Sequence, residues 1–297
     1  MKKVLKILLI IVIVLVILRI VNYLSVNINY LKDKHNYEYT FNIYGTTNNN
    51  IPQGLAYSDK YNIVLQTSYN KKHKVSKLYI SDFNSKKLLK EFNLKNIDNS
   101  INNSHVGGIS TDNNKLWITN DYSIDEFNLE EIINSNSKYI KPIKNTKISI
   151  RGDFCTYYDN NLYVGEFALK PFYNPTNEDP IMIKYNIDNY NEEEYYSLPK
   201  MVQGVVIDNN QFIFVRSYTH FTRSYLNYYE KINTSDSFNN KKYYHFNEDN
   251  LVKKIKIPPM AEGMFYKDNH LYILFESNAD RYFYAIPKIK KVLKIKK

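Results

Sequence analysis

The residues best suited to acid–base chemistry in this 297-residue chain are three glutamates at the ends of short apolar segments. Glu166 follows NLYVG, Glu262 precedes GMFY and Glu276 follows LYILF. Two facing carboxyl groups can divide the roles of general acid and base, for example on a glycosidic bond. These three glutamates are therefore the catalytic candidates.

Oxygen ligands from several segments would also suit a hard cation. The metal-ligand candidates are Glu262, Glu166 and Asp153, and the cation that this donor set favours is Ca²⁺. Five other polar residues at corresponding places are candidates for contacts with a small ligand, namely Gln53, His105, Asn120, Gln203 and Arg216. Three roles stay open for the whole set: a hydrogen-bonding framework only, a ligand or cation site, and a catalytic pair.

Several other kinds of site have no support in the sequence. The single cysteine, Cys155, rules out an internal disulfide and a cysteine-based zinc site. The six histidines are scattered without HxH or HExxH spacing, and neither a glycine-rich phosphate loop nor a Ser-His-Asp signature is present.

The candidate residues belong to a segment that occurs five times. Each copy has a glycine or aspartate, a short apolar strand, an Asp/Asn-rich turn and a second apolar strand, which together indicate a β-hairpin. The copies cover residues 52–69, 106–121, 151–167, 202–218 and 261–277.

Two further strands are expected after each hairpin. The third strands are predicted at 76–83, 123–129, 180–187, 224–232 and 281–288, and the fourth at 88–94, 139–150, 193–200, 251–257 and 291–297. Four antiparallel strands in each of five units indicate an all-β, five-bladed β-propeller, with six blades as the second choice. The additional strand 39–45 is expected to close the ring by pairing with the last blade.

This arrangement predicts where a site would lie. In an antiparallel hairpin the start of the first strand lies beside the end of the second. The starts and ends of all five hairpins should therefore gather at one mouth of the ring, together with the longer connections 168–179 and 218–223. The opposite mouth should carry only the short Asp/Asn turns.

The N-terminus has the properties of a membrane anchor. Residues 4–24 are apolar apart from Lys6, Arg19 and two polar residues near the end, and they are long enough to cross a bilayer. A cleaved signal peptide and a buried core helix are the two alternatives. We expect an uncleaved signal anchor at residues 1–29, followed by a propeller domain at 30–297.

The basic net charge of +10 is concentrated in the two ends of the chain. Residues 1–34 carry five net positive charges and residues 288–297 carry six, which leaves one net negative charge on the rest. A nucleic-acid-binding face should place a basic stripe on the folded domain, so nucleic acid is not an expected partner.

Motifs such as PQGLAY (52–57), HVGGIS (105–110), NNLYVGEF (160–167) and VQGVV (202–206) resemble those of an uncharacterised family of secreted or membrane-anchored β-propeller proteins from Gram-positive bacteria. The other motifs that carry this resemblance are SKLYISD (76–82), PPMAEGM (258–264) and LFES (274–277). The blades are also distantly similar, at the level of fold only, to the lactonase and strictosidine-synthase-like propellers, which usually have six blades and an axial metal.

The resemblance implies a fold and a location but no reaction. We therefore expect a single-pass cell-membrane protein with an extracytoplasmic C-terminal propeller that acts as a binding module. Its partner would be a small ligand, a glycan or a cell-surface protein. The alternative is a propeller hydrolase or lactonase that uses the axial carboxylates, with or without Ca²⁺. The sequence identifies neither the ligand nor the oligomeric state.

Overall fold

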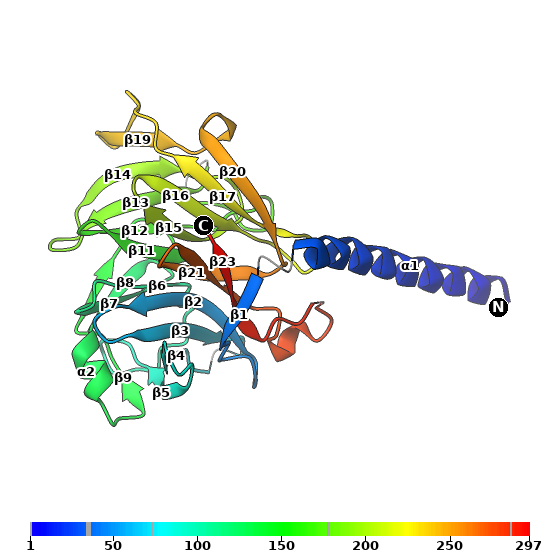
Figure 1. Cartoon of the computed structure of the whole chain (residues 1–297), viewed down its shortest axis with the longest axis horizontal. Helices are drawn as coiled ribbons and strands as arrows, with labels where there is room; N and C mark the ends of the chain where they lie inside the picture. The colour runs from blue at the N-terminus through cyan, green and yellow to red at the C-terminus, as the bar shows by residue number, and fades with distance from the viewer. Residues whose placement is uncertain (1, 34–36, 73, 177–178, 286) are drawn as a thin grey trace.

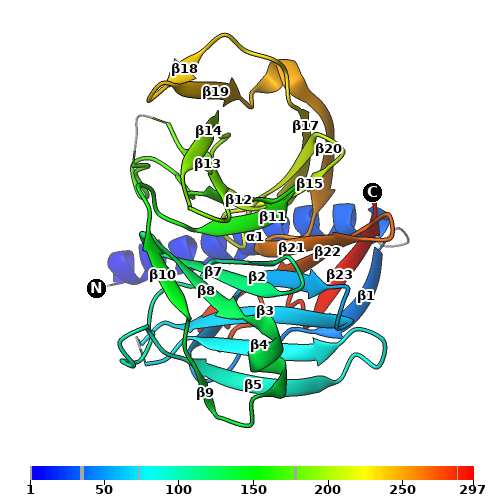
Figure 2. The same cartoon turned by 90° about the vertical axis from the view of Figure 1, so that its left-hand side faces the viewer.

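The computed structural model describes residues 2–33, 37–72, 74–176, 179–285 and 287–297, and side chains of the first helix only as far as residue 25. That helix, α1 (Lys2–Asp33), projects from a ring of five β-sheets (Figures 1 and 2). The five sheets confirm the five-bladed propeller and exclude the six-bladed alternative.

Each sheet is a blade whose first strand is innermost. From the axis outward, blade one contains β2 (Asn50–Ser58), β3 (Ile63–Asn70), β4 (Lys77–Asp82), β5 (Leu88–Leu94) and β9 (Tyr139–Ile140). Blade two contains β6 (Gly108–Thr111), β7 (Lys115–Asn120), β8 (Ser123–Asn128) and β10 (Lys144–Lys147), with the short helix α2 (Leu129–Asn134) between its last two strands. Blade three contains β11 (Phe154–Tyr158), β12 (Asn161–Gly165), β13 (Ile181–Asn186), β14 (Glu192–Ser197), β19 (Lys241–His245) and β18 (Ser237–Phe238).

The last two blades have four strands each. Blade four contains β15 (Val202–Asp208), β16 (Gln211–Arg216), β17 (Ser224–Glu230) and β20 (Leu251–Ile257), the last of which follows the 3₁₀ turn η2 (Glu248–Asn250). Blade five contains β21 (Ala261–Lys267), β22 (His270–Phe275), β23 (Lys291–Lys296) and β1 (Tyr37–Asn42), with the 3₁₀ turn η3 (Asp280–Tyr282) between β22 and β23.

The hairpin turns form as their residue types predict. Asn and Asp residues with positive φ occupy the turn between the first two strands of every blade: Asn62, Asn113, Asp159 and Asn160, Asn209 and Asn210, and Asp268 and Asn269. These residues tolerate the left-handed conformation better than other non-glycine types, so they allow tight connections between the two inner strands. The prediction that the mouth on this side of the ring carries only short turns is wrong, because the longer connections 129–143 and 231–250 leave the outer strands at the same end.

Aromatic and aliphatic side chains fill the spaces between neighbouring blades. Between blades three and four, for example, Phe154, Tyr196, Phe212 and Tyr244 form one buried cluster. The Tyr196 ring of blade three lies against the Phe212 ring of blade four, with the centroids 5.4 Å apart. Such packing joins blades that share no continuous sheet, and the high aromatic content of the sequence supplies it.

The ring closes through the first strand of the chain. β1 pairs antiparallel with β23, so blade five is built from both ends of the sequence (Figure 2). This confirms the predicted closure by the segment that begins near residue 39. It also covers the edge of β23, which would otherwise be left unpaired.

The strand order in blade five corrects one prediction. Residues 281–288 were predicted to be the third strand, but Asp280–Tyr282 form η3 and the third position belongs to β23. Because β1 supplies the fourth strand, the chain after β22 is free to leave the sheet. The tail 291–297, predicted as the fourth strand, therefore lies one position further inward.

The closure predicts the effect of removing a β1 side chain from the core. Phe41 is fully buried and packs against Phe83 and Tyr272. We expect Phe41→Ala to lower the free energy of unfolding by about 3–4 kcal/mol, because it leaves a cavity at the closure. Phe283→Ala, which removes the same atoms from an 80% exposed position, should have little effect in the same denaturation experiment. Equal losses in the two variants would contradict the role of β1.

Candidate functional site

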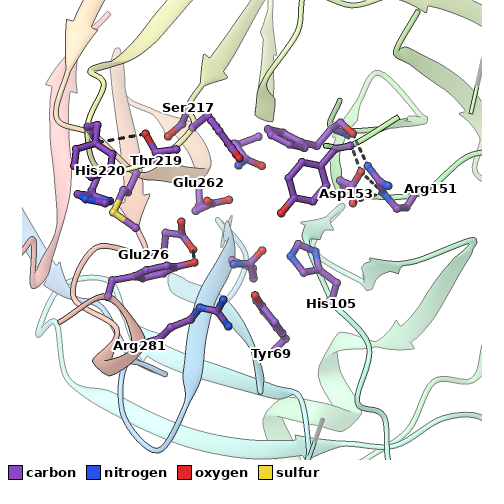
Figure 3. Close-up of a pocket in the computed structure, with 18 of the residues that line it drawn as sticks. Tyr69, His105, Arg151, Asp153, Ser217, Thr219, His220, Glu262, Glu276 and Arg281 are labelled. Carbon is purple, nitrogen blue, oxygen red and sulfur yellow. Dashed lines mark hydrogen bonds and ion pairs between the residues drawn. The ribbon is translucent and has the colours of Figure 1, made fainter. Parts of the chain in front are cut away.

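A cavity of about 520 Å³ lies on the axis at the mouth that carries the longer connections. It takes residues from all five blades, and Figure 3 shows their side chains converging on one space. Beneath it, the five inner strands leave a void of only about 10 Å³, lined largely by glycines and apolar residues. The site is therefore a pocket with one entrance rather than a channel through the ring.

Glu262 and Glu276 form an interacting pair of carboxyl groups in this pocket (Figure 3). Glu262 lies at the start of β21 and is buried, whereas Glu276 follows β22 and is half-buried. The Glu276 carboxylate accepts a hydrogen bond of 2.8 Å from the Tyr282 hydroxyl. Both glutamates belong to blade five.

Burial raises the pKa of both carboxyl groups, and repulsion between charges adds to the effect at Glu262. Burial is the main cause for Glu262, whose pKa lies well above its usual value, and the negative charges of Glu276 and Asp153 raise it further. Burial raises the pKa of Glu276 to about 7, although the Tyr282 hydroxyl and the Arg281 charge act in the opposite direction. Near neutral pH the pair therefore retains at least one proton, as two adjoining carboxyls do when both cannot ionise.

A backbone irregularity directs the Glu262 side chain into the pocket. The pairing of β21 with β22 shifts register between Ala261 and Met264, so Glu262 occupies a β-bulge. The same shift occurs around Gln53 in blade one and Gln203 in blade four, and both side chains line the pocket. Bulges redirect side chains out of the regular alternation, which explains how three inner strands present polar groups at the axis.

An ion pair lies across the pocket from the glutamates. The Arg151 Nε atom donates to both Asp153 oxygens, at 2.9 and 2.7 Å, and the Asp153 carboxylate also accepts from the Phe167 backbone N–H at 2.7 Å. Burial raises the pKa of Asp153 to about 6 despite this neighbouring guanidinium. The Arg151 side chain also donates to the Phe167 carbonyl, so the pair holds the end of β12 against the start of β11.

His105 contributes an uncharged imidazole. Its ring lies against Tyr69, with the centroids 4.7 Å apart. Burial lowers the pKa of His105 to about 4, and its Nδ1 atom is buried without a hydrogen-bond partner among the described residues. The imidazole is therefore neutral at physiological pH.

The structure brings only some of the sequence candidates together. Gln53, His105, Asp153, Gln203, Glu262 and Glu276 all line the pocket. Three others do not. Glu166 accepts hydrogen bonds from Thr176 and the Ile181 backbone, Asn120 bonds Asp125 and Ser123, and Arg216 donates to the Lys200 carbonyl at the surface.

The position of Glu166 tests whether the expected calcium ligands can reach one ion. Its carboxylate is committed to the loop after β12, and Asp153 is committed to Arg151. Within the described part of the chain, no three His, Cys, Asp or Glu side chains are grouped as metal ligands. The set Glu262, Glu166 and Asp153 therefore does not fit a Ca²⁺ ion.

Many of the residues that line the pocket were not among the site residues predicted from the sequence. The additional lining residues include Tyr69, Arg151, Phe167, Tyr218, Arg281 and Tyr282. Three of them, Tyr69, Phe167 and Tyr218, directly follow the strand-end residues that were predicted to face the axis. Phe167 and Tyr218 lie just beyond the ends of β12 and β16, where strand alternation no longer predicts the direction of a side chain. Ser217 lines the pocket as well.

Comparison with known proteins supports the fold. No protein-family model and no curated protein matches the chain. Among solved structures, the glutaminyl cyclase of Myxococcus xanthus aligns with a TM-score of 0.51 and 8% identity, over 88% of this chain and 94% of the enzyme. BamB from Moraxella catarrhalis aligns with a TM-score of 0.39 and 11% identity, over 83% and 85% of the two chains. The resemblance to β-propeller proteins is thus confirmed for the fold alone.

The raised pKa values predict a pH-dependent stability. Between the ordinary glutamate pKa of 4.5 and about 7, the folded chain keeps a proton on Glu276 that the unfolded chain has released. The contribution of this group to stability is complete below that window and is lost as pH rises through it. We expect the melting temperature of Glu276→Gln, relative to the unsubstituted protein, to be higher at pH 8 than at pH 5.

The size of this change follows from the width of the window. A shift of about 2.5 pH units corresponds to at most about 3 kcal/mol. Glu230→Gln, at an exposed position at the end of β17, is the matched control and should show the same difference at both pH values. A Glu276→Gln difference that does not vary with pH would contradict the shared-proton arrangement.

Proposed function

We propose that this chain is a membrane-tethered β-propeller that binds a small, positively charged amine in its axial pocket. The observation that carries the proposal is the Glu262–Glu276 pair, buried in a pocket with aromatic walls. An ammonium group placed beside the pair would take over the role of the shared proton. Both carboxylates could then ionise.

The pocket walls suit the same ligand. Tyr69, Phe167 and Tyr282 present aromatic rings, and a cation near such a ring is stabilised by up to about 2 kcal/mol when water is excluded. On the same side of the pocket as the glutamates, Arg281 lines the wall and could contact an anionic or carbonyl group of the same molecule. The amine then lies towards blade five, and the rest of the ligand extends to the entrance.

The tether is the apolar part of α1. Lys2–Ser25 reach a mean hydropathy of 3.3 with none of their window buried, so the helix is long and apolar enough to cross a bilayer as an anchor or to serve as a signal sequence. Lys2, Lys3 and Lys6 lie at the start of this stretch, and Arg19, Lys32 and Lys34 lie near or beyond its other end, so the difference in basic charge between the two sides is small. The support for an anchored propeller outside the cytoplasm is the short, purely basic leader. This location agrees with the resemblance to membrane-anchored propellers of Gram-positive bacteria.

Amine binding can be tested with benzylamine, using benzyl alcohol as a neutral ligand of the same shape. We expect benzylamine to raise the melting temperature of the full chain in detergent, and to do so more at pH 8 than at pH 6, because binding displaces a proton. Glu262→Gln should abolish the shift, whereas Glu230→Gln should leave it intact. Equal shifts with the amine and the alcohol would contradict the proposal.

Acid–base catalysis is the second candidate function. The observation that favours it is the pKa of Glu276, which at about 7 lets this group both accept and donate a proton near neutral pH. The expected hydrolase or lactonase activity would use the same pair. The fold shared with a glutaminyl cyclase adds a third reaction, in which an N-terminal amine attacks the glutamine carboxamide carbon and ammonia leaves.

The enzyme hypothesis has a direct assay. If the pair is catalytic, the full chain should release ammonia from a peptide with N-terminal glutamine, or hydrolyse a γ-lactone. Glu276→Gln should then lower the rate by about 10²–10⁴-fold. Turnover that survives both Glu276→Gln and Glu262→Gln would place the chemistry elsewhere, and no turnover on either substrate would leave the binding role as the better account.

A further inference from the structure

Exposed aromatic side chains surround the entrance of the pocket. They lie on the turn after β7 and on the loops after β12, β16 and β22, and their exposed fractions range from 40% to 80%. We call this set the mouth rim: Tyr122, Phe172, Tyr173, Phe221, Phe283 and Tyr284.

Exposed aromatic side chains gather on this face. Among the described residues after α1, seven aromatic side chains are exposed, and six of them belong to the mouth rim, the other being Tyr139 on β9. At the opposite mouth the inner hairpins close with short turns of positive-φ Asn and Asp residues, and the longer connections there, 129–143 and 231–250, belong to the outer strands. Large rings left in water on one face are costly unless something covers them, so their clustering indicates an interaction surface.

The apolar helix identifies what lies next to this surface. Arg19 of α1 donates a hydrogen bond to the Tyr284 carbonyl, and its guanidinium lies 5.5 Å from the centre of the Phe221 ring. Within residues 2–25, only Arg19 and Asn22, one turn apart, are partly covered. Figure 1 shows α1 leaving the ring on the side where the loops after β16 (yellow) and β22 (red) project.

The position of Arg19 along α1 determines how deep the mouth rim would lie in a bilayer that the helix crosses. The apolar stretch ends at Ser25, six residues after Arg19, which corresponds to about 9 Å of helix. The headgroup layer on each side of a bilayer is about 5–7 Å thick. If Lys2–Ser25 cross the membrane, Phe221 and Tyr284 are therefore level with the headgroups or with the outer part of the acyl chains.

We propose that the mouth rim is a membrane-docking surface, which seats the pocket entrance in the headgroup layer of the bilayer that holds α1. The inference rests on the membrane tether of the proposed function but not on the identity of the ligand. The rim loops carry both basic and acidic side chains, such as Lys170, Arg281, Asp179 and Asp280. The aromatic rings rather than net charge therefore provide the attraction, as at the interfacial aromatic belts of membrane proteins. An amine carried on a lipid head group would have direct access to the Glu262–Glu276 pair.

Fluorescence quenching by lipids tests the proposal in the full chain. Its one tryptophan, Trp117, is fully buried and gives a constant background. We would place the chain in two kinds of phosphatidylcholine vesicle, with acyl chains brominated near the headgroup or near their methyl ends, and compare three variants. Phe283→Trp reports on the rim, Tyr61→Trp reports on the opposite mouth, and Val14→Trp reports on the middle of the span.

The expected result is strong quenching of Phe283→Trp by the bromines near the headgroup, strong quenching of Val14→Trp by the bromines near the chain ends, and no quenching of Tyr61→Trp by either, unchanged by high salt. Quenching of Val14→Trp without quenching of Phe283→Trp would overturn the docking surface while leaving the tether in place. Absence of quenching in both would overturn the tether as well, and with it the docking surface. Neither outcome depends on benzylamine binding, so failure of the pocket hypothesis would be recognised separately.

Discussion

The close approach of the five innermost strands at the axis determines most other features of this propeller. A Cβ atom on Gly107 would lie 2.1 Å from the Asp153 carbonyl oxygen, and one on Gly263 would lie 2.5 Å from the Leu55 nitrogen. No side chain fits at these positions, so glycine is required by the neighbouring backbone rather than by local turn geometry. Contacts between adjacent inner strands run around the whole ring, and the axis is sealed.

Because the inner strands seal the axis, the mouth of the ring ends in a closed pocket. This pocket in turn surrounds the two carboxyl groups of Glu262 and Glu276 and raises their pKa values. Next to the close glycines, the bulged residues Gln53, Gln203 and Glu262 have room only towards the open mouth. A carboxyl group directed there is surrounded by rings and by a second carboxyl instead of water. The raised pKa of Glu262 therefore follows from backbone crowding in the ring.

The repeated features of the fold, namely the hairpins, the number of blades and the mouth at which the strand ends gather, were predictable from the sequence. Glycines followed by Asp/Asn turns predicted the hairpins, and the number of hairpins predicted the number of blades. The antiparallel geometry of the hairpins then predicted that Gln53, Gln203, Glu262 and Glu276 lie at one mouth. The orientation of single side chains was not predictable in the same way. Glu166 and Phe167 are neighbours with opposite directions, and only the pairing of β12 decides that the ring faces the pocket. The segment 281–288 has the composition of a strand, and it leaves the sheet because β1, some 240 residues earlier in the chain, takes the outer position.

Blade five connects the apolar helix α1 to the site. Its outer strand β1 begins four residues after α1 ends, a separation that an extended chain can span only to about 14 Å. The same blade carries both glutamates and the loop that holds Arg281 and Tyr282 against them. A propeller on a long linker would sample many orientations, whereas this short connection and the Arg19 contact restrict the ring to few. The strand that closes the ring thus also fixes which mouth lies nearest to the apolar helix.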